Sequence, residues 1–224
     1  MFVRRSLVVA SLAALTMSVA RCGDQPTAPR PAVPRLLNWA DTTASFNANV
    51  SQPSAPGMSA AQMAPPAPLE IEKKRVTFWA VRGASRSVQI DYKGKRDAAP
   101  HPFLLLTTTD PQFVPGVGEL AVGDSVLVTV KVDTKKLLVS LEPTGLQFGT
   151  PATLTLWYTG AAEEGDSNAV APDTSLGMFY REDHKDPWVQ IAATQSLEQK
   201  SFTSNIPHFS FYAIASLMDW SASW

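Results

Sequence analysis

The side chains that could bind a metal ion or attack a chemical bond are few in this sequence and lie far apart. Its three histidines lie in separate predicted turns, and its single cysteine is near the N-terminus. A zinc site needs about four Cys, His or carboxylate ligands held close together, so the sequence predicts no zinc site. The residues concerned are His101, His184, His208 and Cys22.

Acidic side chains crowd residues 163–168, where Glu163, Glu164, Asp166 and Asn168 offer the oxygen ligands that calcium prefers. Their spacing does not match an EF-hand loop, so a solvated acidic loop is the main interpretation and calcium binding is the alternative. No Gly-x-Ser-x-Gly motif accompanies the many serines. We therefore expect no metal, no cofactor and no classical hydrolase chemistry.

The overall charge argues against a nucleic-acid partner. The chain carries 19 Lys and Arg against 20 Asp and Glu, a formal net charge of −1. Binding to DNA or RNA needs clustered cations that displace counterions from phosphate. We expect no nucleic-acid partner.

Residues 1–22 are typical of a bacterial export signal. Arg4 and Arg5 precede an apolar run from Leu7 to Val19, which is shorter than the roughly 20 residues of a membrane span. The segment Val19-Ala20-Arg21-Cys22 resembles a lipobox, in which the cysteine is lipidated and becomes the first residue of the mature chain. The resemblance implies a lipid on Cys22 and a protein anchored to a membrane of the cell envelope. Because Arg21 replaces the usual small residue, cleavage by ordinary signal peptidase, giving a periplasmic or secreted protein, is the alternative.

Residues 23–68 contain nine of the 18 prolines, mixed with small and polar residues. Such a composition predicts a disordered linker, because it offers too little apolar surface to fold. Within it, Leu36, Leu37 and Trp39 form an apolar island. We interpret the island as a short helical turn or a loose contact on the domain surface, with a docking peptide for a partner as the alternative.

Residues 69–217 show apolar side chains at every second position, the period of half-buried strands. The clearest case is Val126, Val128, Val130 and Val132, followed by a polar turn and a further strand at 137–141. Short strands separated by polar turns predict an all-β fold, an antiparallel two-sheet sandwich, before a tail at 218–224. The other predicted strands lie at 76–80, 88–92, 103–108, 154–158, 176–180, 188–192 and 209–215.

Several segments between Leu137 and Ala215 resemble a ZU5-like β-sandwich module in their order and spacing. A Pro-x-Gly turn and a second proline precede one strand, an aromatic strand and a tryptophan flank an acidic turn, and His-Phe-Ser opens the last strand. The segments are Leu141–Phe148, Pro151–Leu156, Met178–Tyr180 with Trp188, and Ile206–Ala213. The resemblance implies a β-sandwich of the kind found in bacterial surface proteins and eukaryotic ZU5 domains.

The resemblance also implies one reaction, because His-Phe-Ser is a self-cleavage site in some ZU5-containing death-domain adaptors and in a nucleoporin domain. Here Ser210 Oγ would attack the Phe209 carbonyl, His208 would orient or deprotonate the hydroxyl, and water would hydrolyse the ester. This reaction needs a strained peptide bond. The favoured interpretation is structural: Phe209 and Phe211 lie on the core face of the last strand, His208 caps the loop after Pro207, and Ser210 faces outward at the strand edge.

Tryptophans supply the remaining candidate site. Trp79 and Trp157 lie on the strand faces opposite the predicted core residues, where they could stack on a glycan or contact a peptide. Three functions follow from the sequence. The favoured one is a non-enzymatic envelope module for protein contact, and the others are glycan or peptide binding and self-cleavage.

Overall fold

The computed structural model describes residues 34–41, 43, 45–51, 69–70, 74–96, 99–162 and 173–217. The predicted export signal, Cys22, the acidic loop at 163–168 and the tail at 218–224 lie outside the described residues. The described secondary-structure elements are β-strands, apart from the short 3-10 helix η3 (Asp173–Ser175). In this part of the chain, no helix is both long enough and apolar enough to cross a bilayer.

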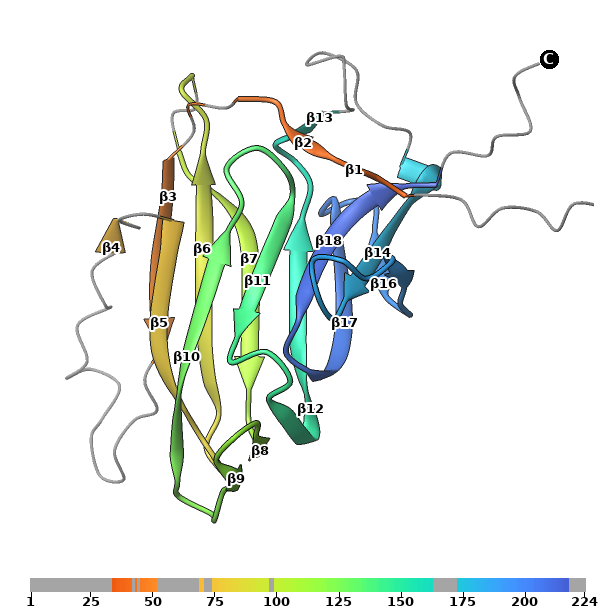
Figure 1. The fold of residues 1–224 in the computed structure, drawn as a ribbon. Helices are drawn as coiled ribbons and strands as arrows, with labels where there is room; N and C mark the ends of the chain where they lie inside the picture. The colour runs from red at the N-terminus through yellow and green to blue at the C-terminus, as the bar shows by residue number, and fades with distance from the viewer. Residues whose placement is uncertain are drawn as a thin grey trace, which may run out of the picture. The chain divides into compact units, whose positions relative to one another are not determined.

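Two antiparallel sheets pack against each other, which confirms the predicted sandwich (Figure 1). The first sheet has the order β15-β14-β18-β11-β10-β5, with β1 beside β18. The second has the order β16-β17-β12-β7-β6-β3-β4, with β8 beside β12 and β9 beside β8, and β13 pairs separately with β2. The strands are β1 (Arg35–Leu36), β2 (Asn38–Trp39), β3 (Ser45–Ser51), β4 (Leu69–Glu70), β5 (Arg75–Val81), β6 (Arg86–Lys93), β7 (His101–Thr108), β8 (Pro111–Val114), β9 (Gly118–Glu119), β10 (Ser125–Val132), β11 (Leu138–Glu142), β12 (Gln147–Trp157), β13 (Ala161–Ala162), β14 (Leu176–Arg181), β15 (Val189–Gln190), β16 (Thr194–Ser196), β17 (Ser201–His208) and β18 (Phe211–Ser216).

Strand β10 shows how the sequence determines the core. Val128 and Val130 are fully buried between the sheets, while Leu127 and Thr129 at the alternate positions point outward, as the alternation predicts. The turn into β11 forms because the Asp133 carboxylate accepts the backbone N–H groups of Lys135 and Lys136. The predicted hairpin of β10 and β11 is therefore confirmed.

The predicted linker at 23–68 is wrong for its described residues between 34 and 51, because these form three strands of the fold. Strand β3 pairs with β6 along its whole length, and β1 pairs with β18. Leu37, Trp39 and Phe46 are buried in the core. The apolar island is thus neither a loose surface contact nor a free docking peptide.

The contacts of Trp39 explain why β1, β2 and β3 are held against the rest of the domain. Its ring stacks on Tyr92 with centroids 4.7 Å apart and meets the edges of Phe46 and Phe103 at 5.2 and 4.7 Å. Its indole Nε1 donates a hydrogen bond to the Asp133 carbonyl oxygen at 2.9 Å. Both the apolar ring and the polar nitrogen are therefore satisfied inside the domain.

The last strand differs from the prediction because the chain changes sheets. β17 belongs to the second sheet and β18 to the first, and Phe209 and Ser210 form the corner between them. The corner interrupts the alternation, so Tyr212 and Ile214 point into the core rather than Phe211. Strand β17 itself was not predicted.

Candidate functional site

The corner at Phe209 and Ser210 is held by backbone hydrogen bonds from the turn between β11 and β12. Phe209 N donates to the Leu146 oxygen at 2.9 Å, and Gly145 N donates to the Phe209 oxygen at 2.8 Å. Gly145 has a φ of 78°, a left-handed conformation that glycine adopts readily. Leu141 N donates to the Ser210 oxygen at 3.0 Å. The carbonyl oxygen of the candidate scissile bond therefore accepts a hydrogen bond from Gly145 N.

Phe209 is a core residue, as the structural interpretation predicts. Its side chain is fully buried, and its ring lies 4.9 Å from that of Phe148. The ring thus fills space between the sheets at the point where the chain passes from one to the other.

Ser210 does not face outward, so that part of the prediction is wrong. The residue is 0% exposed, and its Oγ donates a hydrogen bond to the Arg181 carbonyl oxygen on β14. Because Ser210 belongs to the corner rather than to β18, the strand alternation could not reveal its direction. The hydroxyl proton is therefore used in a hydrogen bond to the neighbouring strand β14.

His208 lies at the end of β17 and does not cap a loop as predicted, since Pro207 is also part of that strand. Its Nε2 is 3.3 Å from Glu182 Oε1, and its ring meets Tyr180 at 5.7 Å. Its Nδ1 is buried and has no hydrogen-bond partner among the described residues. The imidazole therefore contacts Glu182 and Tyr180, and among the described residues no hydrogen bond joins it to Ser210.

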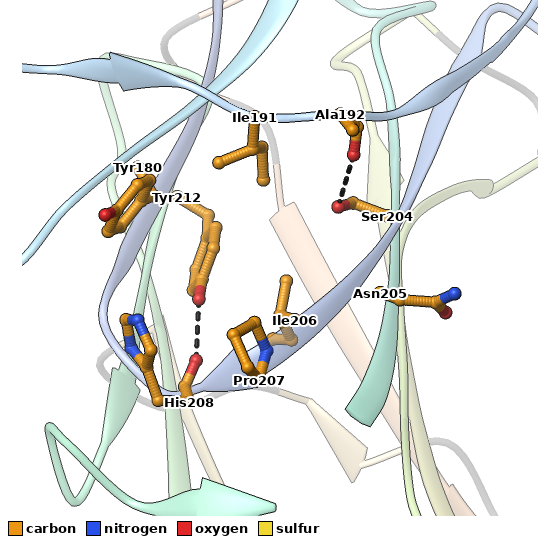
Figure 2. Close-up of a pocket in the computed structure, with 9 residues that line it drawn as sticks. All are labelled: Tyr180, Ile191, Ala192, Ser204, Asn205, Ile206, Pro207, His208 and Tyr212. Atoms are coloured by element: carbon orange, nitrogen blue, oxygen red, sulfur yellow. Dashed lines mark hydrogen bonds between the residues drawn. The ribbon is translucent and has the colours of Figure 1, made fainter. Parts of the chain in front are cut away.

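A cavity lies beside the corner, between the two sheets (Figure 2). It has a volume of about 280 Å³. Tyr212 forms one side, and its hydroxyl donates to the His208 carbonyl oxygen at 2.6 Å. Burial raises the pKa of the Tyr212 phenol well above its usual range, so this hydroxyl stays protonated. The lining residues are Tyr180, Ile191, Ala192, Ser204, Asn205, Ile206, Pro207, His208 and Tyr212.

No motif in the sequence indicated this cavity. Tyr180 and Tyr212 were predicted only as strand residues, and Ser204 and Ile206 belong to the strand that the prediction missed. The cavity depends on how β14, β17 and β18 approach one another, which local alternation does not encode. We find no signal in the sequence that could have located it.

The two outward tryptophans are confirmed as facing away from the core but do not form one platform. Trp79 on β5 is 57% exposed and lies directly across from Leu127 on β10, itself 46% exposed. Trp157 on β12 is half-buried and belongs to the other sheet. Because the outer faces of the two sheets point in opposite directions, the tryptophans cannot contact one flat ligand together.

The acidic turn at residues 182–186, between β14 and β15, is held by its own hydrogen bonds. Asp183 and Asp186 hydrogen-bond each other's backbone N–H, through an Asp186 carboxylate oxygen and the Asp183 carbonyl. The Arg181 guanidinium lies 4.6 Å from the Trp188 ring and 5.5 Å from the Phe211 ring, and it donates to the His184 carbonyl oxygen. These contacts fold the hairpin onto the outer face of β18.

No family model matches this chain, and neither does any curated protein or solved structure. The ZU5-like resemblance therefore stays a prediction.

Within the described ranges no group of three or more His, Cys, Asp or Glu side chains is placed to hold a metal ion. The features that remain are the exposed pair of Trp79 and Leu127 and the cavity beside His208 and Tyr212.

Proposed function

We propose that this chain is a non-enzymatic β-sandwich module of the cell envelope that binds another molecule and is anchored by a lipid on Cys22. The partner is a protein or a glycan. The anchor follows from the lipobox-like segment, and the binding role follows from the outer face of the first sheet.

The contacts of His208, Phe209 and Ser210 favour a structural role over self-cleavage. Self-cleavage needs the Ser210 proton to move to a base while Oγ approaches the Phe209 carbonyl carbon. That proton is instead donated to the Arg181 carbonyl oxygen, and the imidazole of His208 faces Glu182. Neither Phe209 nor Ser210 is among the residues with a cis peptide bond or a positive φ in the described part of the chain.

The observation that carries the proposal is the exposed pair of Trp79 and Leu127. Large apolar side chains exposed side by side lose contact with water when a partner covers them, and tryptophan is the residue most enriched at the energetic centres of interfaces. β5 is also the last strand of its sheet in the described structure, so the pair lies close to a sheet edge.

Glycan binding is the second candidate, and the neighbours of Trp79 favour it. Thr77 and Thr129 form the next register pair on this outer face, because each lies two residues along its strand from Trp79 or Leu127. A sugar ring can place its C–H face on an indole and its hydroxyls on threonine oxygens. One exposed tryptophan provides enough area for a sugar ring, whereas a stable protein interface needs about 800 Å² on each partner.

Replacing Trp79 with alanine should abolish binding while leaving the fold intact. We expect at least a tenfold weaker retardation on polysaccharide affinity gels, or weaker co-sedimentation with isolated envelope material, because a tryptophan at the centre of an interface contributes about 2 kcal/mol or more. Trp157→Ala, on the other sheet, is the matched control. The proposed face is wrong if the Trp157 variant loses binding and the Trp79 variant retains it.

Replacing Cys22 with serine should release the protein from the membrane fraction, because serine cannot receive the thioether-linked lipid. Fractionation of cells followed by intact-mass measurement of the mature chain tests this. A wild-type protein that is already soluble and begins at Arg21 contradicts the lipid anchor while leaving the binding role of Trp79 untouched.

A further inference from the structure

We propose that the cavity between β14, β17 and β18 binds a small ring compound that is neutral or cationic and carries an N–H or O–H donor, such as an indole or a phenol. This site is separate from the Trp79 face, and the inference does not depend on the function proposed above.

The size and walls of the cavity suit a ring. Its volume of about 280 Å³ exceeds the roughly 150 Å³ of an engineered cavity that binds benzene. The Tyr180 and Tyr212 rings, which both line the cavity, are stacked with centroids 6.3 Å apart and 28° between their planes. Ile191 and Ile206 are the apolar side chains above and below the space in Figure 2.

Two of the hydroxyls that border the cavity, those of Ser204 and Tyr212, are fixed as hydrogen-bond acceptors. Ser204 Oγ donates its proton to the Ala192 carbonyl oxygen at 2.8 Å, and the Tyr212 hydroxyl donates its proton to the His208 carbonyl oxygen at 2.6 Å. A carbonyl oxygen cannot donate, so each proton must point away from a ligand. Each hydroxyl has one proton, and what remains available on both oxygens is lone pairs. These two oxygens therefore match a ligand that supplies a donor.

These two acceptors lie on opposite sides of the cavity. Figure 2 shows Ser204 on one side and Tyr212 on the other, with Ile191 and Ile206 between them, while the Asn205 side chain points away. A ring lying between the two isoleucines thus has an acceptor at either side. This arrangement is that of a small-molecule site, mainly apolar with a few oriented polar groups.

The charge around the cavity disfavours anions. Among the described residues no lysine or arginine lines it, and the lining residue His208 has its Nε2 3.3 Å from the Glu182 carboxylate. An anion would lose its hydration and meet lone pairs and a carboxylate. A neutral ligand avoids the loss of ionic hydration, and a cation, although it is desolvated, meets lone pairs and a carboxylate that attract it.

The test compares three probes by chemical-shift mapping on the isotope-labelled protein. Indole has the ring and the donor, 1-methylindole keeps the ring and lacks the donor, and benzoate is an anionic ring. We expect indole to bind with a dissociation constant of about 1 mM or below, a usual efficiency for a ligand of this size. The shifts should centre on Ile191, Ser204 and Tyr212. Both other probes should bind about tenfold more weakly, since a lost hydrogen bond or a desolvated charge has about that effect.

Two variants locate the site. Ala192 is an exposed residue at the rim, so Ala192→Phe should fill the cavity without disturbing the core, and indole binding should fall at least about tenfold, the effect of a lost ring contact. Leu197→Phe places the same side chain on an exposed position outside the lining and should leave binding unchanged. The proposal is overturned if benzoate binds as well as indole, if Ala192→Phe binds indole normally, or if about 5 mM indole produces no shifts at the cavity, well above the expected dissociation constant.

Discussion

Replacing Trp39 with alanine lowers the free energy of unfolding by about 3–5 kcal/mol, the usual cost of truncating a buried aromatic residue. Trp39 is 4% exposed, and its ring contacts Tyr92, Phe103 and Phe46. The substitution leaves a cavity and also removes the donor to the Asp133 carbonyl. Urea unfolding followed by circular dichroism measures the loss.

Trp79→Ala is the matched control for this experiment, because the same side chain is removed from an exposed position. It should cost about 0.5 kcal/mol or less, as surface substitutions usually do. Equal unfolding midpoints for the two variants would contradict the placement of β2 in the fold. A protease-resistant fragment that begins near Leu69, without the N-terminal strands, would contradict it as well.

Phe209→Ala should have an effect of similar size, about 3–5 kcal/mol, because the ring is fully buried against Phe148 at the point where the chain changes sheets. Phe113→Ala is the control, since Phe113 is among the exposed apolar side chains. Thermal unfolding of both variants compares them directly. Equal stabilities would show that the corner is not packed as described.

Ser210→Ala separates the structural role of the corner from self-cleavage. It should cost about 1–3 kcal/mol, because the buried Arg181 carbonyl loses its hydrogen-bond donor. Wild-type protein kept for days at neutral pH should show one intact mass under denaturing conditions. Two fragment masses that correspond to cleavage between Phe209 and Ser210, and that are absent from the Ser210→Ala variant, would show self-cleavage and contradict the structural role.

The sequence predicted the fold class because alternation is strong where a strand has one face on the core. β10 is such a strand, with Val128 and Val130 buried and Leu127 outside. The same rule correctly placed Trp79 and Trp157 on outer faces. Alternation reports only which side of a strand a residue occupies, and this is enough to recognise a sandwich.

The missed elements have two physical causes. β1 to β3 lie in a proline-rich stretch, whose average composition predicted a linker. The few apolar residues in it, such as Leu37 and Phe46, are buried in the core and hold these strands in the fold. At the Phe209 corner the chain crosses between sheets, which shifts the alternation by one residue and inverts the predicted faces of β18. Hydrogen-bond directions, such as those of Ser204 and Tyr212, depend on distant carbonyls and are not encoded locally.

The pairing of β1 with β18 has a consequence for the order in which the domain folds. Arg35 pairs with Ser216 and Leu36 with Ala215, so the first described strand pairs with the last. A ribosome releases β1 long before β18, and closing so long a loop is slow. β1 therefore has no pairing strand until β18 has left the ribosome, and during that interval the nascent chain is more exposed to aggregation.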